Sequence, residues 1–546
     1  MGKDMIAFFT PEVALDQDLH AYSGGLGVVS GDFLRSAYKL DSPVVGVTIL
    51  PRQGYYDQNI ENGLMKISYV NRYYDDILER TDIKFTIDIC SSPVWVEVWR
   101  LPEGKFGAAQ TLFLDADIDP NDHISRLNTL QLYGGSRDSG ANLERKIAQS
   151  LLLARGGIEA LKRLNISVSK YHGNESYTAF VPMELVCEAL KEGKSFKEAI
   201  EYAKSRFVFT THTPARDGNP EYSINSVMRI GGYDKFFHEE ALRKIGSDPF
   251  NMTAACLRLS KKANAVSKKH LETAQRLWHW VNGNSIAKRI IAITNGVSRD
   301  YWQHEDFRDA VTSEEIEKVK LNHKREMIQY IVEKTGRCLG ENILTIVWAK
   351  RFAEYKRPHL LFYNFNQEKS EWIKSQLKEN KLQIIYAGKP HPDDDSMIHA
   401  YNRLLFASYE LPNMVVLAGY ELWLSKLLKA GADVWLNNPR FPMEASGTSG
   451  MSAAMNGALN LSIVDGWECE ADPENYFPFG TQIPGGDQDS FDAQELRRCL
   501  ETTVMPLFYG DKEKWYKKSL AAKFEAEKYW TSDRMVSEYQ KLLYAD

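Results

Sequence analysis

Cysteine is scarce in this sequence, and its six residues lie far apart without a single CxxC pair. This pattern argues against a zinc site built on thiolates and against the disulfide framework of a small secreted domain. A reducing compartment suits such isolated thiols, so we expect a cytoplasmic protein. The residues are Cys90, Cys187, Cys256, Cys338, Cys469 and Cys499.

Long apolar runs and an excess of basic charge are also missing. No apolar window reaches the length of about 18 residues that a membrane span needs, and segment 1–16 is too short in apolar residues for a signal peptide. The 67 basic and 73 acidic side chains give a net charge of −6, which repels a polyphosphate backbone. We therefore expect neither a membrane nor a nucleic acid as partner.

The sequence does contain enough apolar material for large cores, with 546 residues of which 43% are hydrophobic. Short apolar runs alternate with helix-length segments along the chain, which is typical of βα units around a parallel sheet. The predicted fold class is α/β, with two Rossmann-like domains. We place the junction near residue 297, which gives domains 1–297 and 298–546, because a highly charged helical stretch follows that point.

Buried strands are predicted from these apolar runs. The first half has fewer regular signals, and it adds a long helical stretch over residues 143–164 and strand-rich insertions near residues 66–115. The residues after 493 are predicted to end the second domain. The predicted strands are 6–9, 44–49, 207–211 and 290–294 in the first half, and 343–348, 382–387, 414–418, 433–436 and 459–464 in the second.

Two motifs in the first half follow predicted strands, at the sheet edge where ligands bind. Gly24 and Gly25 open a helix-like segment and offer backbone N–H groups to an anion, although a Gly-Gly pair can also be only a tight turn. His212 follows strand 207–211 directly, as a ligand-facing or a structural histidine. In the segment 171–177, Asn174 or Ser176 could simply cap the next helix.

Two motifs in the second half are rich in charge or in small residues. After strand 343–348, Arg351 and Lys356 could reach one anion across a tight turn, or could form a solvated basic turn. The stretch 435–452 places Glu444 beside Ser, Thr and Gly residues, where it could accept sugar hydroxyls. The run 391–395 of histidine and aspartates is typical of a solvated turn, no HExxH spacing occurs, and we predict no metal.

These motifs, SGGLG, THTP, TNGV, KRFAEYKR, GKPHP and NNPRFPMEASGTSGM, occur in the order seen in the α-glucan phosphorylases, and the chain resembles their short prokaryotic form over about residues 5–470. The resemblance implies a GT-B architecture, two Rossmann-like domains facing a central cleft, and retaining transfer of an α-hexosyl group. It implies a sugar-contacting role for His212 and a hexose-binding set, Asn295, Glu444, Ala445, Ser446 and Gly447. It also implies phosphate-binding groups, Lys350, Arg351, Lys356 and Thr448, with Gly24 and Gly25 as the closing glycine loop.

One departure from the family concerns its cofactor. The lysine that holds pyridoxal phosphate in the family falls eight residues after this glutamate, and here that position is Ser452. A serine cannot form a Schiff base, so covalent pyridoxal phosphate is excluded, and we expect no required cofactor and no noncovalent substitute. A second departure is Tyr177, where the family has histidine, which puts the acceptor side or cofactor shell in doubt.

The predicted function is therefore a hexosyltransferase of the phosphorylase family that works without pyridoxal phosphate. We expect a sugar nucleotide or sugar phosphate as donor and a carbohydrate or small hydroxyl compound as acceptor, with a homodimer as a further expectation from the family. Two alternatives stay open. One is an α-glucan phosphorylase that releases glucose 1-phosphate from maltodextrin or glycogen, and the other is a non-catalytic glycan-binding protein.

Overall fold

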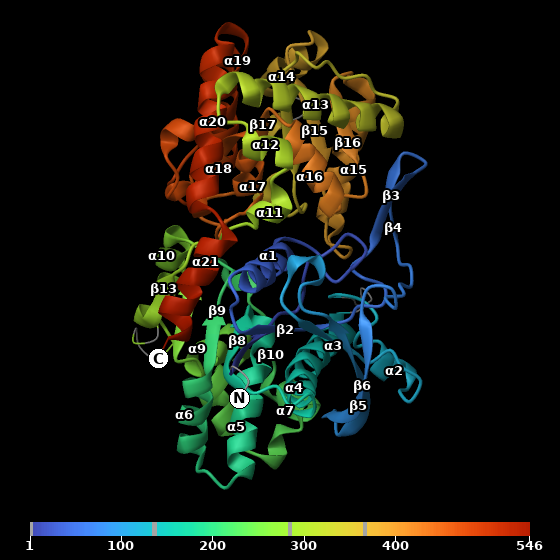
Figure 1. Ribbon diagram of the computed structural model, residues 1–546, viewed down its shortest axis with the longest axis vertical. Coiled ribbons are helices and arrows are strands. Elements are labelled where there is room, and N and C mark those ends of the chain that lie inside the picture. The colour runs from blue at the N-terminus through green and yellow to red at the C-terminus, as the bar shows by residue number, and fades with distance from the viewer. Residues whose placement is uncertain (1–3, 134–138, 282–284, 286, 364–367, 546) are drawn as a thin grey trace. The chain divides into compact units, whose positions relative to one another are not determined.

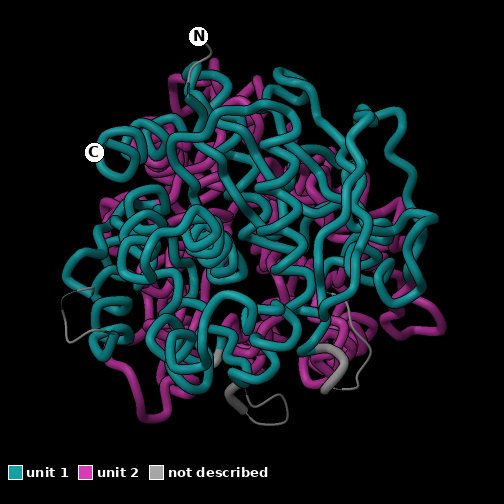
Figure 2. The backbone as a smooth tube through the Cα atoms, turned by 90° about the horizontal axis from the view of Figure 1, so that it is seen from below, with its two compact units in different colours: residues 1–55, 69–294, 533–546 teal, residues 56–68, 295–532 magenta. Residues whose placement is uncertain are grey.

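The computed structural model describes residues 4–133, 139–281, 285, 287–363 and 368–545 (Figure 1). The chain divides into two compact units, which Figure 2 draws in different colours. Unit 1 consists of Met1–Tyr55, Tyr69–Thr294 and Asp533–Asp546, and unit 2 consists of Tyr56–Ser68 and Asn295–Ser532. Each unit is built on its own sheet.

Unit 1 has a nine-stranded sheet in the order β13-β12-β9-β8-β1-β2-β7-β6-β5. The strands from β13 to β7 pair in parallel, whereas β6 pairs antiparallel with both β7 and β5. The first strand, β1, lies in the interior of the sheet. The next strands in the chain, β2 and β5 to β7, lie on one side of it, and the later strands, β8, β9, β12 and β13, lie on the other. The bounds are β1 Met5–Phe9, β2 Val44–Ile49, β5 Glu79–Ile89, β6 Ser92–Leu101, β7 Thr111–Asp115, β8 Val168–Asn174, β9 Phe207–Thr210, β12 Lys262–Ala265 and β13 Ile290–Ala292.

The helices of unit 1 connect the parallel strands, and their ends follow local sequence rules. For example, α6 (Phe196–Arg206) begins at a capping box in which Ser195 and Glu198 exchange side-chain and backbone hydrogen bonds, and it lies beside α5 (Phe180–Lys191; Figure 1). The long predicted helix 143–164 is interrupted by a π-helical turn, Leu152–Gly156. The remaining main helices are α1 Gly25–Lys39, α3 Ser139–Leu151, α4 Gly157–Arg163, α7 Ile224–Gly231, α8 Glu239–Gly246, α9 Met252–Arg258 and α10 Lys268–Leu277.

Unit 2 has a six-stranded sheet, entirely parallel, in the order β16-β15-β14-β17-β18-β19. Five of its strands, β14, β15, β16, β17 and β18, are buried along their whole length, as expected for strands covered on both faces. The chain runs from β14 to β16 on one side and then crosses to β17 on the other. The bounds are β14 Thr345–Ala349, β15 Gln383–Ala387, β16 Met414–Leu417, β17 Val434–Asn437, β18 Leu459–Ile463 and β19 Phe477–Phe479.

The helices of unit 2 pack on this sheet (Figure 1). The longest, α13, starts at a capping box between Thr312 and Glu315 and ends at Gly336, whose φ of 68° favours glycine. Met327 and Ile331 of α13 join the core with residues of β14, β15 and β17. The helices are α11 Arg299–Trp302, α12 Glu305–Asp309, α13 Ser313–Thr335, α14 Glu368–Lys378, α15 Asp395–Glu410, α16 Leu422–Gly431, α17 Ser449–Met455, α18 Gln488–Cys499, α19 Met505–Gly510 and α20 Lys512–Tyr529.

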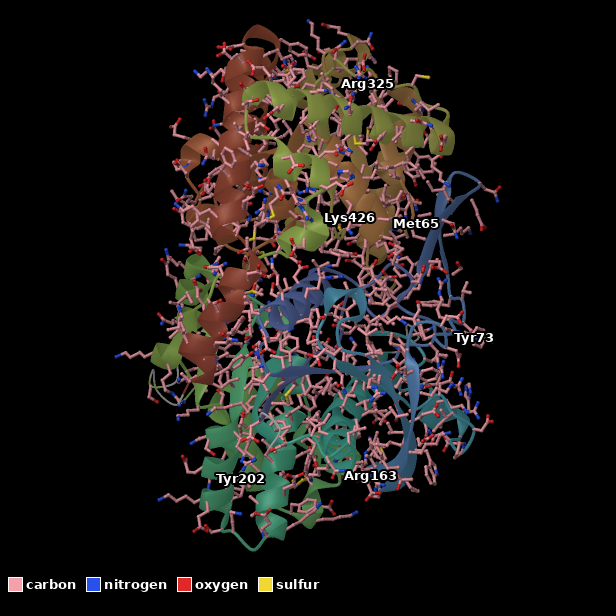
Figure 3. All side chains as sticks on the ribbon, in the orientation of Figure 1. Met65, Tyr73, Arg163, Tyr202, Arg325 and Lys426 are labelled. Carbon is pink, nitrogen blue, oxygen red and sulfur yellow. The ribbon has the colours of Figure 1, made fainter. Side chains whose placement is uncertain are left out.

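Two segments lie in a different unit from the predicted division at residue 297. The hairpin of β3 (Asp57–Glu61) and β4 (Leu64–Ser68) belongs to unit 2, where the N–H of Met65 (labelled in Figure 3) donates to Asn402 Oδ1 at 2.9 Å. The last residues belong to unit 1, because Met535, Tyr539 and Leu543 are buried in the core that contains β1. The predicted division assigned both segments by their order in the chain. Their contacts in the folded protein assign each of them to the other unit.

The α/β prediction is confirmed, and each predicted strand overlaps an observed one within a few residues. Two parallel strands of unit 1, β8 and β12, were not predicted. Both carry polar residues, such as His172 in β8 and Asn264 in β12, that are fully buried in the sheet. In the described part of the chain, no helix combines the length and the apolarity needed to cross a bilayer.

Candidate functional site

The candidate residues of unit 2 lie at the point where the strand order reverses. β14 and β17 are neighbours in the sheet but are connected to opposite sides of it. The loops that follow them, 350–357 and 438–448, therefore leave the same sheet edge in different directions. This is the position in which parallel α/β sheets bind ligands, and it holds the two richest motifs of the sequence.

Lys350 is the first residue after β14, and burial disfavours its positive charge. Its Nζ donates to the carbonyl oxygen of Leu436 and to Asn437 Oδ1, both at 2.6 Å. Burial, reinforced by the nearby charge of Lys356, lowers the pKa of Lys350 to about 7. An anion in this place would restore the charge, so Lys350 is suited to bind one.

Lys356 forms an ion pair with Glu444, with Nζ and Oε2 2.5 Å apart and both side chains about 85% buried. Burial disfavours the ammonium, but Glu444 outweighs it and raises the pKa of Lys356. The charge of Arg351 acts on Lys356 in the opposite sense, which places the exposed Arg351 within electrostatic range. The structure thus brings Arg351, Lys356 and Glu444 together at one sheet edge.

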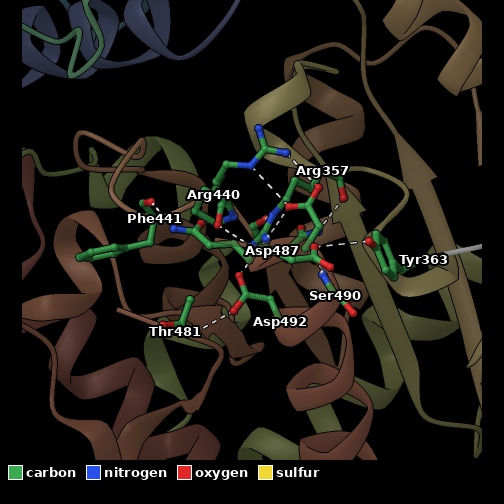
Figure 4. A network of polar contacts seen from close by, with 12 residues as sticks. Arg357, Tyr363, Arg440, Phe441, Thr481, Asp487, Ser490 and Asp492 are labelled. Carbon is green, nitrogen blue, oxygen red and sulfur yellow. Dashed lines mark hydrogen bonds and ion pairs between the residues drawn. The ribbon is translucent and has the colours of Figure 1, made fainter. Parts of the chain in front are cut away.

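The other arginine of this basic run has a structural role. Arg357 is fully buried, and its guanidinium donates to Asp492 at 2.7 Å and to the backbone oxygens of Asn438 and Pro439 (Figure 4). Arg440 donates to Asp489 at 2.9 Å in the same network. These bonds hold the turn after β17 in place, and with it Glu444.

The residues that follow Glu444 form a tight, mostly buried turn. The N–H of Glu444 donates to Asp465 Oδ2 at 2.9 Å, and the carbonyl oxygen of Ser446 accepts from the N–H of Trp467 at 3.0 Å. Ala445 and Ser446 are buried, and Gly447 has φ of 78°, which favours glycine. Thr448 precedes α17, and its hydroxyl makes no capping hydrogen bond.

Ser452 lies within α17 and is 1% exposed. Its hydroxyl is directed back to the helix, where it contacts the carbonyl oxygens of Ser449 at 3.1 Å and Thr448 at 3.2 Å. The side chain carries no amine, and its hydrogen-bonding capacity is used within the helix. Position 452 therefore does not fit a covalently held pyridoxal phosphate.

Two further residues of unit 2 bear on the site. Glu468 was not predicted from the sequence. It is buried and accepts from Ser462 Oγ at 3.0 Å and from Asn437 Nδ2 at 3.3 Å, and burial raises its pKa well above the usual range. Its only sequence signal was its place shortly after a buried strand. Asn295, which was predicted, is 3% exposed in the loop after β13, directly before Gly296, whose α-carbon faces the backbone of Thr531.

In unit 1 the glycine pair follows β1 and begins α1. A Cβ added to Gly24 or Gly25 would meet nothing within 4 Å, whereas one added to Gly31 would lie 2.0 Å from the carbonyl oxygen of Ala14. Packing therefore requires glycine at 31 but not at 24 or 25. The N–H groups of Ser23 and Gly24 donate to Glu12 Oε2 at 2.5 and 3.2 Å, so this buried carboxylate fixes the loop.

His212 follows β9, two strands from β1 in the sheet, and its protonation state can be derived. Asn174 Nδ2 donates to Thr10 Oγ1 and Ser30 Oγ, so Asn174 Oδ1 is the acceptor for His212 Nε2 at 2.7 Å. Nε2 thus carries the proton, and burial lowers the pKa of His212 to about 3. The imidazole is neutral near pH 7, with a lone pair on Nδ1 available to a hydroxyl.

Neither Asn174 nor Ser176 caps a helix, as was considered possible from the sequence. Glu175 does so, because its Oε1 accepts from the N–H of Ser176 at 2.7 Å at the start of the short 3-10 helix Ser176–Thr178. Asn174 ends β8, and α5 begins only at Phe180 after an uncapped Ala179. Glu175 Oε2 accepts from the N–H of His212 at 2.9 Å and from Thr213 Oγ1 at 3.0 Å. Asn174 and Glu175 therefore position the His212 loop. Tyr177 lies beside Tyr133, with ring centroids 5.4 Å apart.

A cavity of about 340 Å³ opens beside this loop and is lined by residues of unit 1 that include Pro214, Arg216, Glu221, Trp278 and Trp280. Trp280 is 44% exposed. Trp302, Trp435 and Trp467, by contrast, are buried and pack in the protein interior.

Comparisons with known proteins identify related families over both parts of the chain. A model of the carbohydrate phosphorylase family matches residues 258–497, and a model of the starch synthase catalytic domain matches residues 5–280. Maltodextrin phosphorylase of Thermococcus litoralis is 30% identical over 609 residues, which cover 100% of this chain and 71% of that protein. Glycogen phosphorylase of Aquifex aeolicus is 29% identical, covering 100% and 86%.

A third relative is an uncharacterized protein of Methanocaldococcus jannaschii, 37% identical over 545 residues that cover 98% of this chain and 99% of that protein. Together with the two Rossmann-like sheets, these matches confirm the resemblance drawn from the motifs. The chain belongs to the carbohydrate phosphorylase family and is a glycosyltransferase of the GT-B fold.

Proposed function

We propose that this glycosyltransferase works without pyridoxal phosphate and transfers an α-hexosyl group, with retention, from a sugar nucleotide to a hydroxyl acceptor. The observation that carries the proposal is Ser452, whose hydroxyl is bonded within α17 where the family has its cofactor lysine. The cations that the resemblance assigns to phosphate, Lys350, Arg351 and Lys356, are nevertheless present. A site that keeps its phosphate-binding groups and has no cofactor anchor is best explained by a second phosphate that arrives with the substrate.

The donor diphosphate would bind at the sheet edge of unit 2. Arg351, Lys350 and Lys356 are assigned to its negative charge, and Thr448 to one of its oxygens through the hydroxyl that caps no helix. When the sugar leaves, charge develops on the diphosphate, and fixed cations stabilise that charge more than the charge of the ground state. The leaving oxygen then takes the proton of the acceptor on the same face.

The transferred sugar would meet the turn that follows Glu444. Glu444 accepts sugar hydroxyls, and it shares Lys356 with the phosphate, so one ion pair links sugar and leaving group. In unit 1, His212 is assigned to the sugar as a neutral hydrogen-bonding group rather than as an acid, because its pKa is far below neutrality. We place the acceptor with unit 1, where Trp280 lines an open cavity.

The match of residues 5–280 to a synthase model supports this proposal. A specific observation favours a second candidate, an α-glucan phosphorylase, because relatives that align with the whole chain carry the names maltodextrin phosphorylase and glycogen phosphorylase. A glycan-binding protein without turnover is the third. We also propose a cytoplasmic location, which is supported by six free cysteines.

The test compares ligands by thermal unfolding of the purified full chain, with sugar nucleotides, glucose 1-phosphate, and pyridoxal phosphate with orthophosphate as separate arms. A ligand at 100 times its dissociation constant stabilises the fold by about 2.7 kcal/mol. We expect one sugar nucleotide to raise the unfolding midpoint, Arg351→Ala to abolish the rise, and transfer to maltodextrin to follow. Arg325→Ala (Figure 3) removes an exposed arginine on α13, paired with Glu341, and serves as the matched control.

Stabilisation only by pyridoxal phosphate with orthophosphate, together with release of glucose 1-phosphate from maltodextrin, would overturn the proposal in favour of the phosphorylase. Binding of maltodextrin that survives Arg351→Ala, with no turnover of any donor, would favour the glycan-binding protein. Ser452→Ala should leave transfer within about twofold of the original chain, since the proposal gives this hydroxyl no part in the chemistry.

A further inference from the structure

A group of three metal-ligating side chains lies outside the candidate site, between α12 and α13 of unit 2. His304 precedes α12, Asp306 is in α12, and His323 is in α13, and one potential ligand atom from each lies within 4.8 Å of the others. Asp306 Oδ2 is 3.0 Å from His323 Nε2 and 3.5 Å from His304 Nδ1. This group was not predicted from the sequence, because His323 and Asp306 lie on different helices.

The hydrogen bonds of His323 show which of its ring nitrogens faces Asp306. Its Nδ1 lies 2.9 Å from Glu326 Oε2, one turn further along α13, and a carboxylate can only accept. With Nδ1–H donating to Glu326, Nε2 is the nitrogen that faces Asp306 Oδ2, 3.0 Å away. A cation between these two atoms, whether a proton or a metal ion, can be bound by both.

His304 adds a third donor atom to the same point. Its Nδ1 carries a single in-plane lone pair, which accepts a long hydrogen bond of 3.3 Å from the N–H of Asp306, and a bound ion would replace this bond. The rings of His304 and His323 lie with centroids 4.3 Å apart, so both imidazoles face the same small volume.

We propose that His304, Asp306 and His323 bind a divalent metal ion with the ligand preferences of Zn²⁺. Two imidazole nitrogens and one carboxylate oxygen are a ligand set that Zn²⁺ accepts, with water in the fourth position. Glu326 acts as the outer carboxylate that holds the tautomer of His323, as second partners of metal-bound histidines commonly do. The side chains of His304 and Asp306 are about half exposed, which gives the ion access from solvent.

The surroundings suit a structural ion. Phe307 stacks on His323, with centroids 5.2 Å apart, and Lys320 Nζ points away to the carbonyl oxygens of Ala430 and Asn456. The N–H of His304 donates to Asn456 Oδ1 at 2.9 Å, directly after the end of α17. An ion here would connect α12 and α13 and, through Asn456, support the end of α17.

The experiment is a calorimetric titration of the full chain, freed of any histidine tag and of bound metal, with Zn²⁺. We expect one tight equivalent, weakened at least tenfold by His304→Ala or Asp306→Asn and by about 10- to 100-fold by Glu326→Gln. These three side chains are exposed, so the variants should fold. His399→Ala, an exposed histidine of α15 whose Nδ1 contacts the backbone oxygen of Asp395, is the matched control and should bind as the original chain does.

Co²⁺ gives a second readout, because its spectrum distinguishes nitrogen and oxygen ligands from thiolates. A spectrum free of thiolate charge-transfer bands, lost in Asp306→Asn, supports the site. The proposal is overturned if the original chain binds no Zn²⁺ at micromolar concentration, if Asp306→Asn binds it equally well, or if the cobalt spectrum is that of cysteine ligands.

Discussion

At the scale of single residues, Lys350 connects the pH of the solution to donor binding. Because the pKa of Lys350 is about 7 in the free protein, binding of a diphosphate should be accompanied by uptake of a proton at Lys350. We predict that sugar-nucleotide affinity falls by about tenfold from pH 6 to pH 8, as the ammonium is lost. The diphosphate of a sugar nucleotide is a diester that keeps its charge over this range, so the dependence reports on the protein.

Calorimetry in two buffers of different ionisation enthalpy measures this proton uptake. Lys350→Gln should bind more weakly and lose the pH dependence. If the dependence survives in that variant, another group is its source. The same shift affects folding in a defined sense. Because the folded pKa is below the unfolded value of 10.5, Lys350 costs stability progressively as pH falls from about 10 to 7 and no more below that.

The ion pair of Lys356 and Glu444 gives a second prediction at this scale. Removing one member of a mostly buried pair leaves the other charge unpaired, so Lys356→Met should lower the free energy of unfolding by about 3 kcal/mol. Adding Glu444→Gln should restore much of that loss while transfer stays abolished. Urea unfolding of the four proteins of this double-mutant cycle measures the coupling.

A matched cycle on Lys381 and Glu379, an ion pair whose side chains are each about half exposed, should give less than about 1 kcal/mol. Equal coupling energies in the two cycles would show that Lys356 and Glu444 do not form the desolvated pair described here. Retention of transfer in the double variant would remove both residues from the proposed chemistry.

At the scale of elements, helix α1 contains one glycine that packing requires, Gly31, and one whose α-carbon is open to a ligand, Gly25. Gly31→Ala should lower the unfolding midpoint, because its Cβ would overlap the carbonyl oxygen of Ala14. Gly25→Ala meets no protein atom, so the midpoint should be unchanged or higher, whereas transfer should fall at least tenfold if the ligand approaches this backbone. Paired melting curves and turnover rates make the comparison, and full activity in Gly25→Ala would exclude the glycine pair from the site.

Elements also show which parts of the structure the sequence could predict. The central strands of unit 2 were predictable because burial on both faces requires continuous apolar runs. β8 was not, since its buried end consists of Tyr171, His172, Gly173 and Asn174, whose polar groups are satisfied only by distant partners such as Thr210 and Tyr544. Such satisfaction is a property of the fold and leaves no periodic signal.

The candidate site, too, could be predicted from the sequence only in part. Lys350, Lys356 and Glu444 could be predicted from a position after a strand and from family motifs. Their pairing, and the buried Glu12, Glu175 and Glu468 that fix the loops, could not, because each depends on contacts between segments far apart in the chain. Arg357 stands in the same basic run as Lys356, yet the fold makes it a structural cation.

At the scale of the whole molecule, the two units should respond separately to loss of the C-terminal segment. Residues 533–546 supply Met535, Val536, Tyr539 and Leu543 to the core of unit 1. Deleting them exposes that core, so we predict a lower unfolding midpoint for unit 1 and little change in unit 2. Hydrogen exchange followed by peptide resolves the two, with faster exchange expected in β1 and β8 and unchanged exchange in β14 and β15.

A point variant refines that prediction. Leu543→Ala removes part of the same apolar contact and should cost about 2–5 kcal/mol, whereas Leu542→Ala alters a neighbour that is 47% exposed and should be nearly neutral. Uniform destabilisation of both units by the deletion would mean that they unfold as one cooperative body.

The return of the last residues to unit 1 also orders events during synthesis. All of unit 2 has been translated once Ser532 is made, whereas unit 1 still lacks the segment that closes its core. Domains generally fold as they emerge from the ribosome, the N-terminal one first. Here the core of unit 1 is completed only after unit 2 has been translated, because it lacks Met535, Tyr539 and Leu543 until those residues are made.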